Sequence, residues 1–187
     1  QETKVQDEHF PQEQIADAGY NCVFKGQKTY NGVAIISRHK IRHLGFGLED
    51  EPSDPSRLVA ADIDGVSIVN TYVPQGKFVE SKEFPYKLDW FKRLKVYFDN
   101  NFKPSDPLVW VGDLNVAPEP RDVFDHASKE HHVCFQKDVR EALKDVMDWG
   151  FVDVFRQHCE DQGQYSFWDY RAKNTVQKNK GWRIDHI

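Results

Sequence analysis

The chain is poor in cysteine and has no Cys-x-x-Cys pair. Its three cysteines, Cys22, Cys134 and Cys159, are odd in number and widely spaced along 187 residues. Disulfide frameworks need paired cysteines and structural zinc sites need closely spaced ligands, so this spacing argues against both and favours a reducing compartment. We expect the three thiols to be small core or surface groups, and none of them to be a nucleophile.

Long apolar runs, linkers and internal repeats are missing as well. The longest apolar runs, such as residues 33–36, are far too short to cross a bilayer, and no positively charged leader precedes an apolar stretch. With 39% hydrophobic residues and no linker rich in Gly, Ser or Pro, the chain can bury one substantial core. We therefore expect a soluble, monomeric protein with a single domain over residues 1–187.

Positive charge is in short supply, because the formal net charge is −5. Duplex binding depends on basic side chains that displace condensed counterions, so this balance does not by itself favour a nucleic-acid partner. Two stretches are nevertheless locally basic, and they either bind phosphate or form ordinary solvated loops. Residues 38–42 carry Arg38, Lys40 and Arg42, and residues 171–183 carry no acid but have Arg171, Lys173, Lys178, Lys180 and Arg183.

Alternating and continuous apolar patterns predict several strands. Residues 31–37, 57–62 and 66–73 read as strands, and Asp64-Gly65 between the last two is a strong signal for a two-residue hairpin. Residues 108–111 form a short, wholly apolar run, which is typical of a strand buried on both faces. Antiparallel pairing is therefore expected in the fold.

Two segments have helical spacing. Large apolar residues recur at intervals of three and four between Phe84 and Phe98, and a second helix covers residues 142–147 and ends before Gly150. In the first helix we expect the lysines to face solvent on the opposite side; they are Lys87, Lys92 and Lys95. Helices mixed with hairpins indicate a mixed-sheet α/β or α+β domain with helices covering sheets.

The most informative motif follows the apolar run at residues 108–111. Gly112-Asp113-Leu114-Asn115 places a carboxylate and an amide at the carboxyl end of a strand, where open α/β sheets bind ligands. Asp113 can hold a hard divalent cation or align a nucleophile, and Asn115 can donate to an anionic phosphate without charge repulsion. Taken alone, the tetrapeptide is equally a strand followed by an Asx-stabilised turn.

Four further motifs accompany it in a fixed order. They are Gln1-Glu2-Thr3-Lys4, Asn-Thr-Tyr-Val-Pro-Gln-Gly at residues 70–76, Tyr-Ser-Phe-Trp-Asp-Tyr-Arg at residues 165–171 and Gly-Trp-Arg-Ile-Asp at residues 181–185. Together the five motifs closely resemble the exonuclease III family of DNA-repair nucleases, within the endonuclease/exonuclease/phosphatase superfamily. The resemblance extends over essentially the whole chain. It implies a DNase I-like four-layer α/β (α+β) sandwich, in which two packed mixed β-sheets are flanked by helices.

The resemblance also implies an activity. Members hydrolyse DNA phosphodiesters with the help of a metal ion, as 3′-to-5′ exonucleases on duplex DNA and as apurinic/apyrimidinic endonucleases in base-excision repair. The expected partner is double-stranded DNA with abasic sites or 3′ ends, and the expected location is the cytoplasm of a bacterial-type cell. Two alternatives stay open: the same fold acting on RNA or on a phosphorylated lipid or inositol, and an inactive module that only binds DNA.

By this resemblance, the metal and phosphate residues come from three motifs. Glu2 is the principal ligand of Mg²⁺ or Mn²⁺, with Asp113 and Asn115 beside it, because hard cations prefer oxygen ligands. Asp113 also orients the attacking water, and Asn115 donates to the scissile phosphate. Lys4, two residues after Glu2 in an extended segment, projects to the same face and contacts substrate or positions a neighbouring carboxylate.

The second motif supplies further groups to the phosphate. Tyr72 matches a tyrosine that hydrogen-bonds a non-bridging or leaving oxygen, so it is assigned a catalytic role. Asn70 is expected either to support the catalytic groups or to be a simple turn-side amide. Gln75 is expected to contact phosphate, although it stands where some relatives have asparagine.

Asp185 matches an aspartate that orients a catalytic histidine. The family's Ser-Asp-His motif and the strand that precedes Gln-Glu-Thr-Lys are absent from the sequence. We therefore expect this chain to be an internal part of a longer enzyme. The available histidines lack the Ser-Asp context and are expected mostly on the surface; those considered are His126, His131, His132, His158 and His186.

The last two motifs suggest how a lesion is chosen. Phe167, Trp182 and Ile184 match the apolar wall that receives a sugar lacking its base, and Arg183 is expected to contact substrate. Trp182 and Ile184 alternate onto one face of a strand, which supports a shared surface. Ordinary core packing is the alternative role for these side chains.

Overall fold

The computed structural model describes all residues from Gln1 to Ile187. Its contacts divide the chain into two compact units. The first unit comprises Gln1–Tyr72 and Tyr97–Gly112, and the second comprises Val73–Val96 and Asp113–Ile187. The expectation of a single domain stays a prediction. No helix combines the length and the apolar content that crossing a membrane requires.

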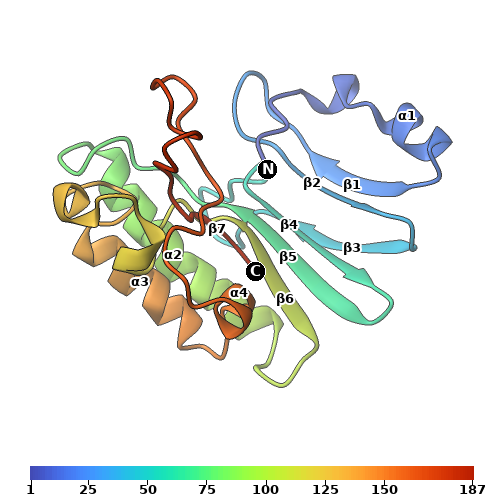
Figure 1. Cartoon of the computed structure of the whole chain (residues 1–187). Helices are drawn as coiled ribbons and strands as arrows, with labels where there is room; N and C mark the ends of the chain where they lie inside the picture. The colour runs from blue at the N-terminus through green and yellow to red at the C-terminus, as the bar shows by residue number, and fades with distance from the viewer. The chain divides into compact units, whose positions relative to one another are not determined.

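The first unit is built from two sheets (Figure 1). The strands β1 (Asn21–Lys25) and β2 (Val33–Ser37) form an antiparallel pair. In the second sheet the neighbouring strands follow one another in the order β3 (Ile41–Phe46), β4 (Leu58–Ile63), β5 (Val66–Tyr72) and β6 (Leu108–Asp113).

Alternate residues of the two sheets meet in one apolar core. Val33 and Ile35 of β2 pack with Val59 and Ala61 of β4, and all four are buried. Because successive strand residues point to opposite faces, these same-face positions show that the two sheets pack face to face. The first unit therefore contains the pair of packed sheets that the resemblance to the nuclease family implied.

The predicted strands and hairpin agree with the structure to within two residues at each end. β4 and β5 pair antiparallel, and the turn between them has positive φ at Asp64 (53°) and Gly65 (85°). Positive φ at both central residues is the type I′ geometry that Asp-Gly favours. The strand expected over residues 31–37 begins only at Val33, because Asn31 and Gly32 have positive φ of 53° and 94°.

β6 corresponds to the predicted strand at residues 108–111, but its burial differs from the prediction. Trp110 is buried, whereas Leu108, Val109 and Val111 are only half-buried, so the strand is not enclosed on both faces. Gly112 is required near its end, because a Cβ there would lie 2.0 Å from the carbonyl oxygen of Thr71 on β5. The strand thus reaches the Asp113 position only with glycine before it.

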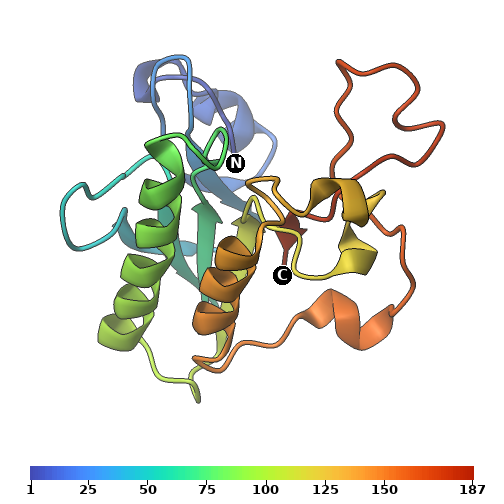
Figure 2. The same ribbon diagram turned by 90° about the vertical axis from the view of Figure 1, so that its left-hand side faces the viewer.

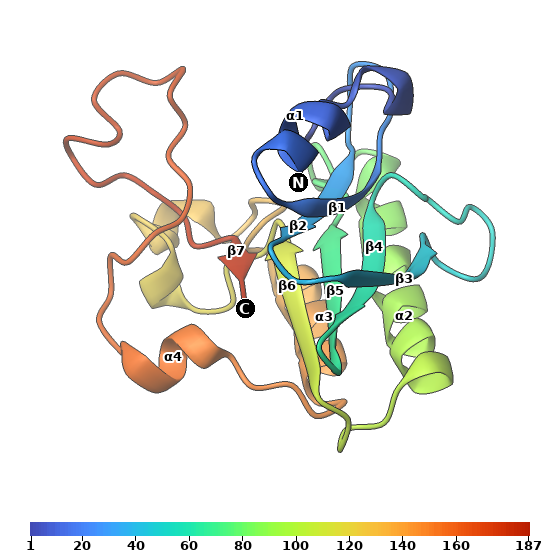
Figure 3. The ribbon, with the colours of Figure 1, turned by 90° about the vertical axis from the view of Figure 1, so that its right-hand side faces the viewer.

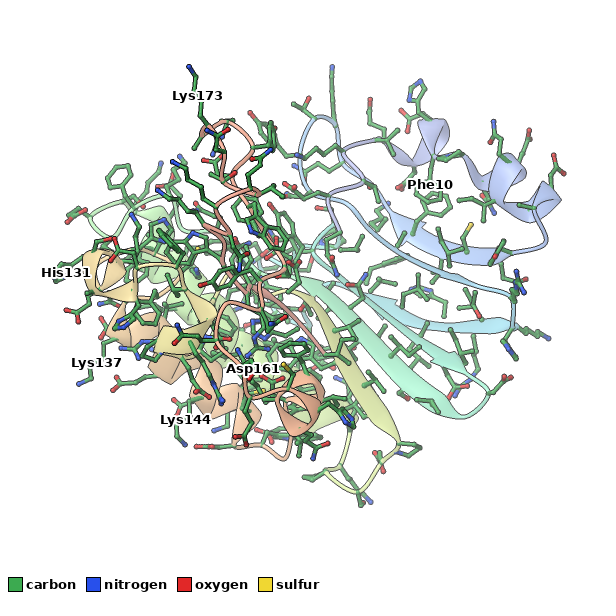
Figure 4. The ribbon with its side chains drawn as sticks, viewed as in Figure 1. Phe10, His131, Lys137, Lys144, Asp161 and Lys173 are labelled. Atoms are coloured by element: carbon green, nitrogen blue, oxygen red, sulfur yellow. The ribbon has the colours of Figure 1, made fainter.

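Short helices complete the first unit. They are the 3-10 turn η1 (Asp7–His9) and the helix α1 (Gln12–Asp17), which lies beside β1 in Figure 3. Phe10, between η1 and α1, stacks on Phe24 of β1 with ring centroids 3.9 Å apart, and Figure 4 shows its side chain.

The second unit is mainly helical and irregular. Its longest helix, α2 (Glu83–Asn101), lies side by side with α3 (Lys137–Met147) in Figure 2 and extends at its end into the first unit. The helix expected to end before Gly150 is thus confirmed. The remaining elements are η2 (Pro120–Asp122), η3 (His126–Lys129), α4 (Val154–His158) and β7 (Asp185–His186).

One prediction for α2 is wrong. Lys92 is exposed and Lys95 is half-buried, but Lys87 is completely buried, with 0% exposure. The reason is spacing: Lys87 lies three residues after Phe84 and four before Phe91, so it belongs to the apolar stripe of the helix.

Candidate functional site

In the first unit, the carboxylate of Glu2 is held between a phenol and an ammonium. The Tyr72 hydroxyl donates a hydrogen bond to Oε1 at 2.8 Å, and Lys4 Nζ lies 3.3 Å from Oε2. The side chains of Glu2 and Lys4 are 43% and 52% exposed. The structure thus brings together three residues that the sequence assigned to the site: Glu2 to metal binding, Lys4 to substrate binding and Tyr72 to catalysis.

The backbone route to this cluster differs from the prediction. The segment is not extended, because Glu2 and Lys4 have positive φ of 56° and 52°. Instead, the Thr3 and Lys4 N–H groups donate to the carbonyls of Gly32 (3.3 Å) and Asn31 (2.9 Å). A Cβ on Gly32 would lie 1.9 Å from Thr3 Oγ1, so the glycine permits this close approach. The contact between Lys4 and Glu2 is present, but the extended-strand argument for it was wrong.

Tyr72 is itself held by Arg57, which the sequence analysis missed. Arg57 Nη1 donates to the Tyr72 carbonyl at 3.1 Å, and its guanidinium lies 5.0 Å from the centre of the Tyr72 ring. Arg57 precedes β4, and the Tyr72 N–H donates to its carbonyl at 2.7 Å. The antiparallel register of β4 and β5 therefore places the arginine, and no local motif signals it.

Asn70 lies inside β5 and not in a turn. Its side chain is 5% exposed, donates to the Ala34 carbonyl at 3.0 Å and accepts a hydrogen bond from the Gln1 side chain. Asn70 therefore ties the chain start and β2 to β5, which is a supporting role.

In the second unit, Asp113 and Asn115 form a tight turn after β6. Asn115 has a positive φ of 51°, and its N–H donates to Asp113 Oδ1 at 2.9 Å. The Asn115 side-chain amide donates to the Val73 carbonyl at 3.0 Å, and the Val73 N–H donates to the Asp113 carbonyl at 2.9 Å. An Asx turn and a functional arrangement are therefore not alternatives here, because the turn itself orients both side chains.

The buried ammonium of Lys87 lies behind this turn. Lys87 Nζ donates to the carbonyls of Asn115 (2.7 Å), Val133 (2.7 Å) and Gln75 (3.2 Å). Burial lowers the pKa of Lys87 to about 8, and the electrostatic influence of Cys134, followed by that of Asp113, opposes this shift. Gln75 is exposed, and its side-chain oxygen accepts a hydrogen bond from the Lys77 N–H at 2.7 Å. The sequence analysis did not identify Lys87 as a functional candidate. Its spacing from Phe84 and Phe91 places it in the apolar stripe of α2, but we expected it to face solvent.

The expected apolar wall is partly assembled. Phe167 and Trp182 exchange two backbone hydrogen bonds of 2.9 Å, with Phe167 38% exposed and Trp182 half-buried. Ile184 is buried, with 7% exposure, and its carbonyl accepts a hydrogen bond from the Leu114 N–H at 2.9 Å. This bond links the segment that carries the wall to the turn that carries Asp113.

Two side chains near the wall were not predicted to act there. Ser166 Oγ accepts hydrogen bonds of 3.1 Å from the N–H groups of Ile184 and Asp185. The His132 ring centre lies 4.5 Å from that of Trp182. The Asp185 side chain is exposed.

Arg183 is placed differently from its neighbours on this segment. It is 3% exposed, and its guanidinium donates to Asp122 (2.7 Å and 3.3 Å) and to Asp153 (2.8 Å). Asp122 also accepts a hydrogen bond from Arg156 and has 0% exposure. In this structure the Arg183 charge is satisfied by the buried Asp122 carboxylate and the half-buried Asp153 carboxylate, and its contact with substrate stays a prediction.

The basic segment at residues 171–180 is a surface loop. All of its residues except Thr175 are exposed, and Figure 4 shows Lys173 at its tip. The Arg171 guanidinium pairs with Asp169 at 2.9 Å, whereas Lys180 Nζ lies 5.3 Å from the centre of the Phe124 ring. The loop therefore presents positive charge outward.

The available oxygen donors fit a hard divalent cation. The Glu2 carboxylate is accessible, and the Asp113 carboxylate stands at a strand end, so both offer the ligand type that Mg²⁺ and Mn²⁺ prefer. The structure contains no group of three or more His, Cys, Asp and Glu side chains that could hold a metal ion of any kind. The donor chemistry of Glu2 and Asp113 is that of carboxylate oxygen.

The chain is similar to known nucleases over its whole length. A model of the Endonuclease/Exonuclease/phosphatase family matches residues 1–187. Exodeoxyribonuclease III of Haemophilus influenzae is 31% identical over 201 aligned positions, which cover 100% of this chain and 74% of that enzyme. The sequence resemblance to the exonuclease III family is thereby confirmed.

Solved structures agree with the sequence comparison. An AP endonuclease from Archaeoglobus fulgidus superposes with a TM-score of 0.96 and 43% identity, covering 99% of this chain and 72% of that chain. The 3′-5′ exonuclease NExo from Neisseria meningitidis gives a TM-score of 0.93 and 36% identity with the same coverage of both chains. These similarities confirm the expected fold class, the DNase I-like α/β sandwich.

Proposed function

Since the chain belongs to the Endonuclease/Exonuclease/phosphatase family, we propose that it hydrolyses DNA phosphodiesters in base-excision repair. The two activities are incision of duplex DNA at apurinic/apyrimidinic sites and 3′-to-5′ exonucleolytic removal of nucleotides. The observation that carries the proposal is the Glu2 carboxylate held by Tyr72 and Lys4, within a chain that also retains the Asp113 and Asn115 turn. These are the residue types that phosphodiester hydrolysis needs.

Glu2, Asp113 and Asn115 are the residues that would hold the metal, which is Mg²⁺ or Mn²⁺. When bound, such an ion neutralises charge on the phosphate oxygens. Lys4 adds a further positive charge beside Glu2, at 3.3 Å. The oxygen-only donor set supports a hard cation.

Asp113 acts on the attacking water. Its Oδ1 is held by the Asn115 N–H at 2.9 Å, so the carboxylate has a defined orientation in which to accept a proton or align the nucleophile. Tyr72 has a phenol hydroxyl that donates to Glu2 in this structure and can donate to a phosphate oxygen with substrate present. Asn115 and Gln75 donate to the phosphate, and Asn70 supports the first unit's cluster.

The lesion is recognised by shape. Phe167, Trp182 and Ile184 form the wall for a sugar without a base, because such a sugar needs no unstacking and leaves room that a base would fill. Arg183 holds this segment through Asp122. Asp185 would orient the histidine of the family's Ser-Asp-His motif, which is not among the residues of this sequence. The exposed lysines of residues 171–180 contact the DNA backbone, which positions the protein without reading the sequence.

A single assay tests the proposal. Purified protein is incubated with a duplex that contains one abasic site and with a duplex that has a recessed 3′ end, with Mg²⁺ and with EDTA. We expect Mg²⁺-dependent cleavage of both, and Asp113→Asn should lower kcat by about 10³-fold or more while the folded state is retained. Asp145→Asn, which changes an exposed aspartate of α3, is the matched control.

The alternatives give different outcomes in this assay. If the protein binds duplex DNA in EDTA and cleaves neither duplex with Mg²⁺, it is a DNA-binding module and not an enzyme. Cleavage of RNA or release of phosphate from a phosphorylated inositol, with no cleavage of either DNA, would keep the fold and change the substrate. Activity of Asp113→Asn near the wild-type level would remove Asp113 from the mechanism.

A further inference from the structure

Lys87 is an ammonium in the interior of the second unit. It has 0% exposure and lies on the apolar stripe of α2 with Phe84, Phe91 and Leu94, all of which are buried. Burying a charge is costly unless hydrogen bonds replace its lost hydration. A methionine or leucine would fill the same stripe without that cost, so the charge needs a reason of its own.

The hydrogen bonds of Lys87 supply that reason. An ammonium has three donors, and all three find backbone carbonyls, those of Gln75, Asn115 and Val133. The three carbonyls come from segments far apart in sequence. One side chain therefore joins three loops, and it does so through the main chain.

Two of the three segments carry residues assigned to the phosphate. Asn115 has a positive φ of 51°, a conformation that asparagine tolerates better than most residues with a side chain. The Asn115 N–H, on the peptide that precedes this residue, is bound to Asp113 Oδ1, and the Asn115 carbonyl, on the peptide that follows it, is bound to Lys87. Holding the carbonyl therefore restrains the residue whose other peptide group orients the Asp113 carboxylate. The Gln75 carbonyl is fixed from the same nitrogen at 3.2 Å.

The third segment packs against the same turn. Val133 is buried beside Cys134, and the Cys134 carbonyl accepts a hydrogen bond from the Ala117 N–H at 2.7 Å. A Cβ on Gly76 would lie 3.1 Å from Lys87 Cδ, so the lysine stem is closely packed on the Gln75 side as well. The ammonium is therefore held in place by its surroundings, as a positioning group must be.

We propose that Lys87 is a positioning residue of the nuclease: its buried ammonium holds the carbonyls of Asn115 and Gln75 and thereby sets the orientation of Asp113 and Asn115 toward the phosphate. This inference rests on the proposed function. Lys87 touches no substrate, and it acts through the backbone of the residues that do. A purely stabilising lysine would instead affect folding and leave the chemistry of the folded protein unchanged.

The first test compares three variants of α2. Lys87→Met keeps an unbranched apolar stem that ends one atom before the ammonium nitrogen, so it removes the charge and the donors. Lys92→Met removes an exposed lysine, and Leu94→Ala destabilises the same stripe without touching a hydrogen bond. At saturating Mg²⁺ and well below the melting temperature, Lys87→Met should lower kcat about 10²-fold with KM within about threefold of wild type. Lys92→Met and folded Leu94→Ala should keep the wild-type kcat. A wild-type kcat in folded Lys87→Met overturns the proposal.

A double-mutant cycle identifies the route of the effect. If Lys87 acts through Asn115, then adding Lys87→Met to Asn115→Ala should lower kcat by less than about threefold beyond Asn115→Ala alone. The full loss of about 10²-fold in both backgrounds would show that the two residues act independently, and this would also overturn the proposal.

Amide hydrogen exchange tests the positioning without any assay of cleavage. Lys87→Gln, which retains two donors, replaces Lys87→Met if the latter does not fold. In the Lys87 variant the N–H groups of residues 114–117 should exchange about tenfold faster than in Leu94→Ala of comparable stability. Equal exchange at these residues in the two variants overturns the proposal. Absence of DNA cleavage by the wild type would refute the proposed function alone, because the exchange result still decides whether Lys87 restrains the turn.

Discussion

At the scale of single residues, Glu2 has an exposed carboxylate that is contacted by one neutral donor, Tyr72, and one positively charged donor, Lys4. Glu2 has the Tyr72 hydroxyl at 2.8 Å and the Lys4 ammonium at 3.3 Å. Both partners are hydrogen-bond donors, the kind of group from which carboxylate and phosphate oxygens accept. The pair of positive-φ residues, Glu2 and Lys4, is held by the loop at Asn31 and Gly32 and not by strand geometry.

Glu2→Gln tests the metal assignment. An amide oxygen is a poorer ligand for a hard dication than a carboxylate oxygen, so we expect half-maximal activity to need about tenfold more Mg²⁺ or more. DNA affinity measured in EDTA should stay within about twofold. Titration of Mg²⁺ in a steady-state assay measures the shift, with Glu8→Gln at another exposed acid as the control. An unchanged activation curve would remove Glu2 from the metal site.

At the scale of elements, the segment with Trp182 and Ile184 is anchored by buried ion pairs. Arg183 points away from these two residues to Asp122 and Asp153, and Arg156 joins Asp122 as well. Burial raises the pKa of Asp122, but its hydrogen bonds and charge pairing with Arg183 and Arg156 outweigh burial, and the pKa is lowered overall. The carboxylate is therefore charged and essential to its two cationic partners.

Asp122→Asn should destabilise the protein by about 3–5 kcal/mol, because it removes the carboxylate charge that two buried guanidinium groups share and leaves Arg183 paired with Asp153 alone. Chemical denaturation at pH 7 measures the change, and Asp125→Asn, at an exposed position with positive φ that asparagine tolerates, should change stability by less than about 0.5 kcal/mol. Because the folded pKa lies below the ordinary value of 3.8, this contribution is present above that value and disappears as the pH falls through the lowered pKa. If Asp122→Asn and Asp125→Asn lowered the free energy of unfolding by the same amount, Asp122 would not be an anchor of this segment.

His186 of β7 gives a second pH dependence at higher pH. Burial, followed by the Arg183 charge, lowers its pKa to about 4. Its Nδ1 lies 3.1 Å from Arg183 Nη1, which can only donate, so the neutral ring accepts there and donates through Nε2 to the Val116 carbonyl at 2.8 Å.

The unfolded chain takes up a proton on this histidine near pH 6.5, whereas the folded protein does so only near pH 4. The free energy of unfolding should therefore fall as the pH decreases from about 6.5 to 4. His186→Gln should flatten this part of the stability curve, and His158→Gln, at an exposed position of α4, should not. The same slope in His186→Gln as in wild type would contradict the assignment.

At the scale of the whole molecule, the net charge of −5 hides a local basic surface. The lysines of residues 171–180 are exposed, and the side chain of Lys173 extends from the loop tip in Figure 4. By contrast, Lys137 and Lys144 on α3 pair with Glu141 and Asp148. Charge distribution, and not net charge, decides whether an acidic protein can bind a duplex.

Replacing Lys173, Lys178 and Lys180 with alanine should weaken binding to all duplexes alike. If each lysine displaces one counterion, the slope of log affinity against log salt should decrease in magnitude by about 2 to 3. Lys92, Lys137 and Lys144, replaced together, change the net charge equally and form the control. A wild-type salt slope in the variant of Lys173, Lys178 and Lys180 would show that the loop is an ordinary solvated surface.

Trp182→Ala should instead reduce the preference for abasic over intact DNA and leave the salt slope of binding unchanged.

The sequence alone determined the features that depend on local pattern and on motif identity. The Asp64-Gly65 hairpin, α3 before Gly150 and the Gly112–Asn115 turn follow from turn chemistry and from periodicity over neighbouring residues, and the ordered motifs identified the family. These signals depend on neighbouring residues only, so they can be recognised in the sequence without the tertiary structure.

Only the tertiary structure decided which partners distant residues find. Arg57 reaches Tyr72 through the register of β4 and β5, Arg183 turns inward to Asp122, and the Lys87 ammonium meets three carbonyls inside the second unit. A lysine or an arginine is usually exposed, and the sequence carries no sign of the buried acceptors that make these positions favourable. Their placement depends on contacts between segments far apart in the chain, and those contacts exist only once the chain has folded.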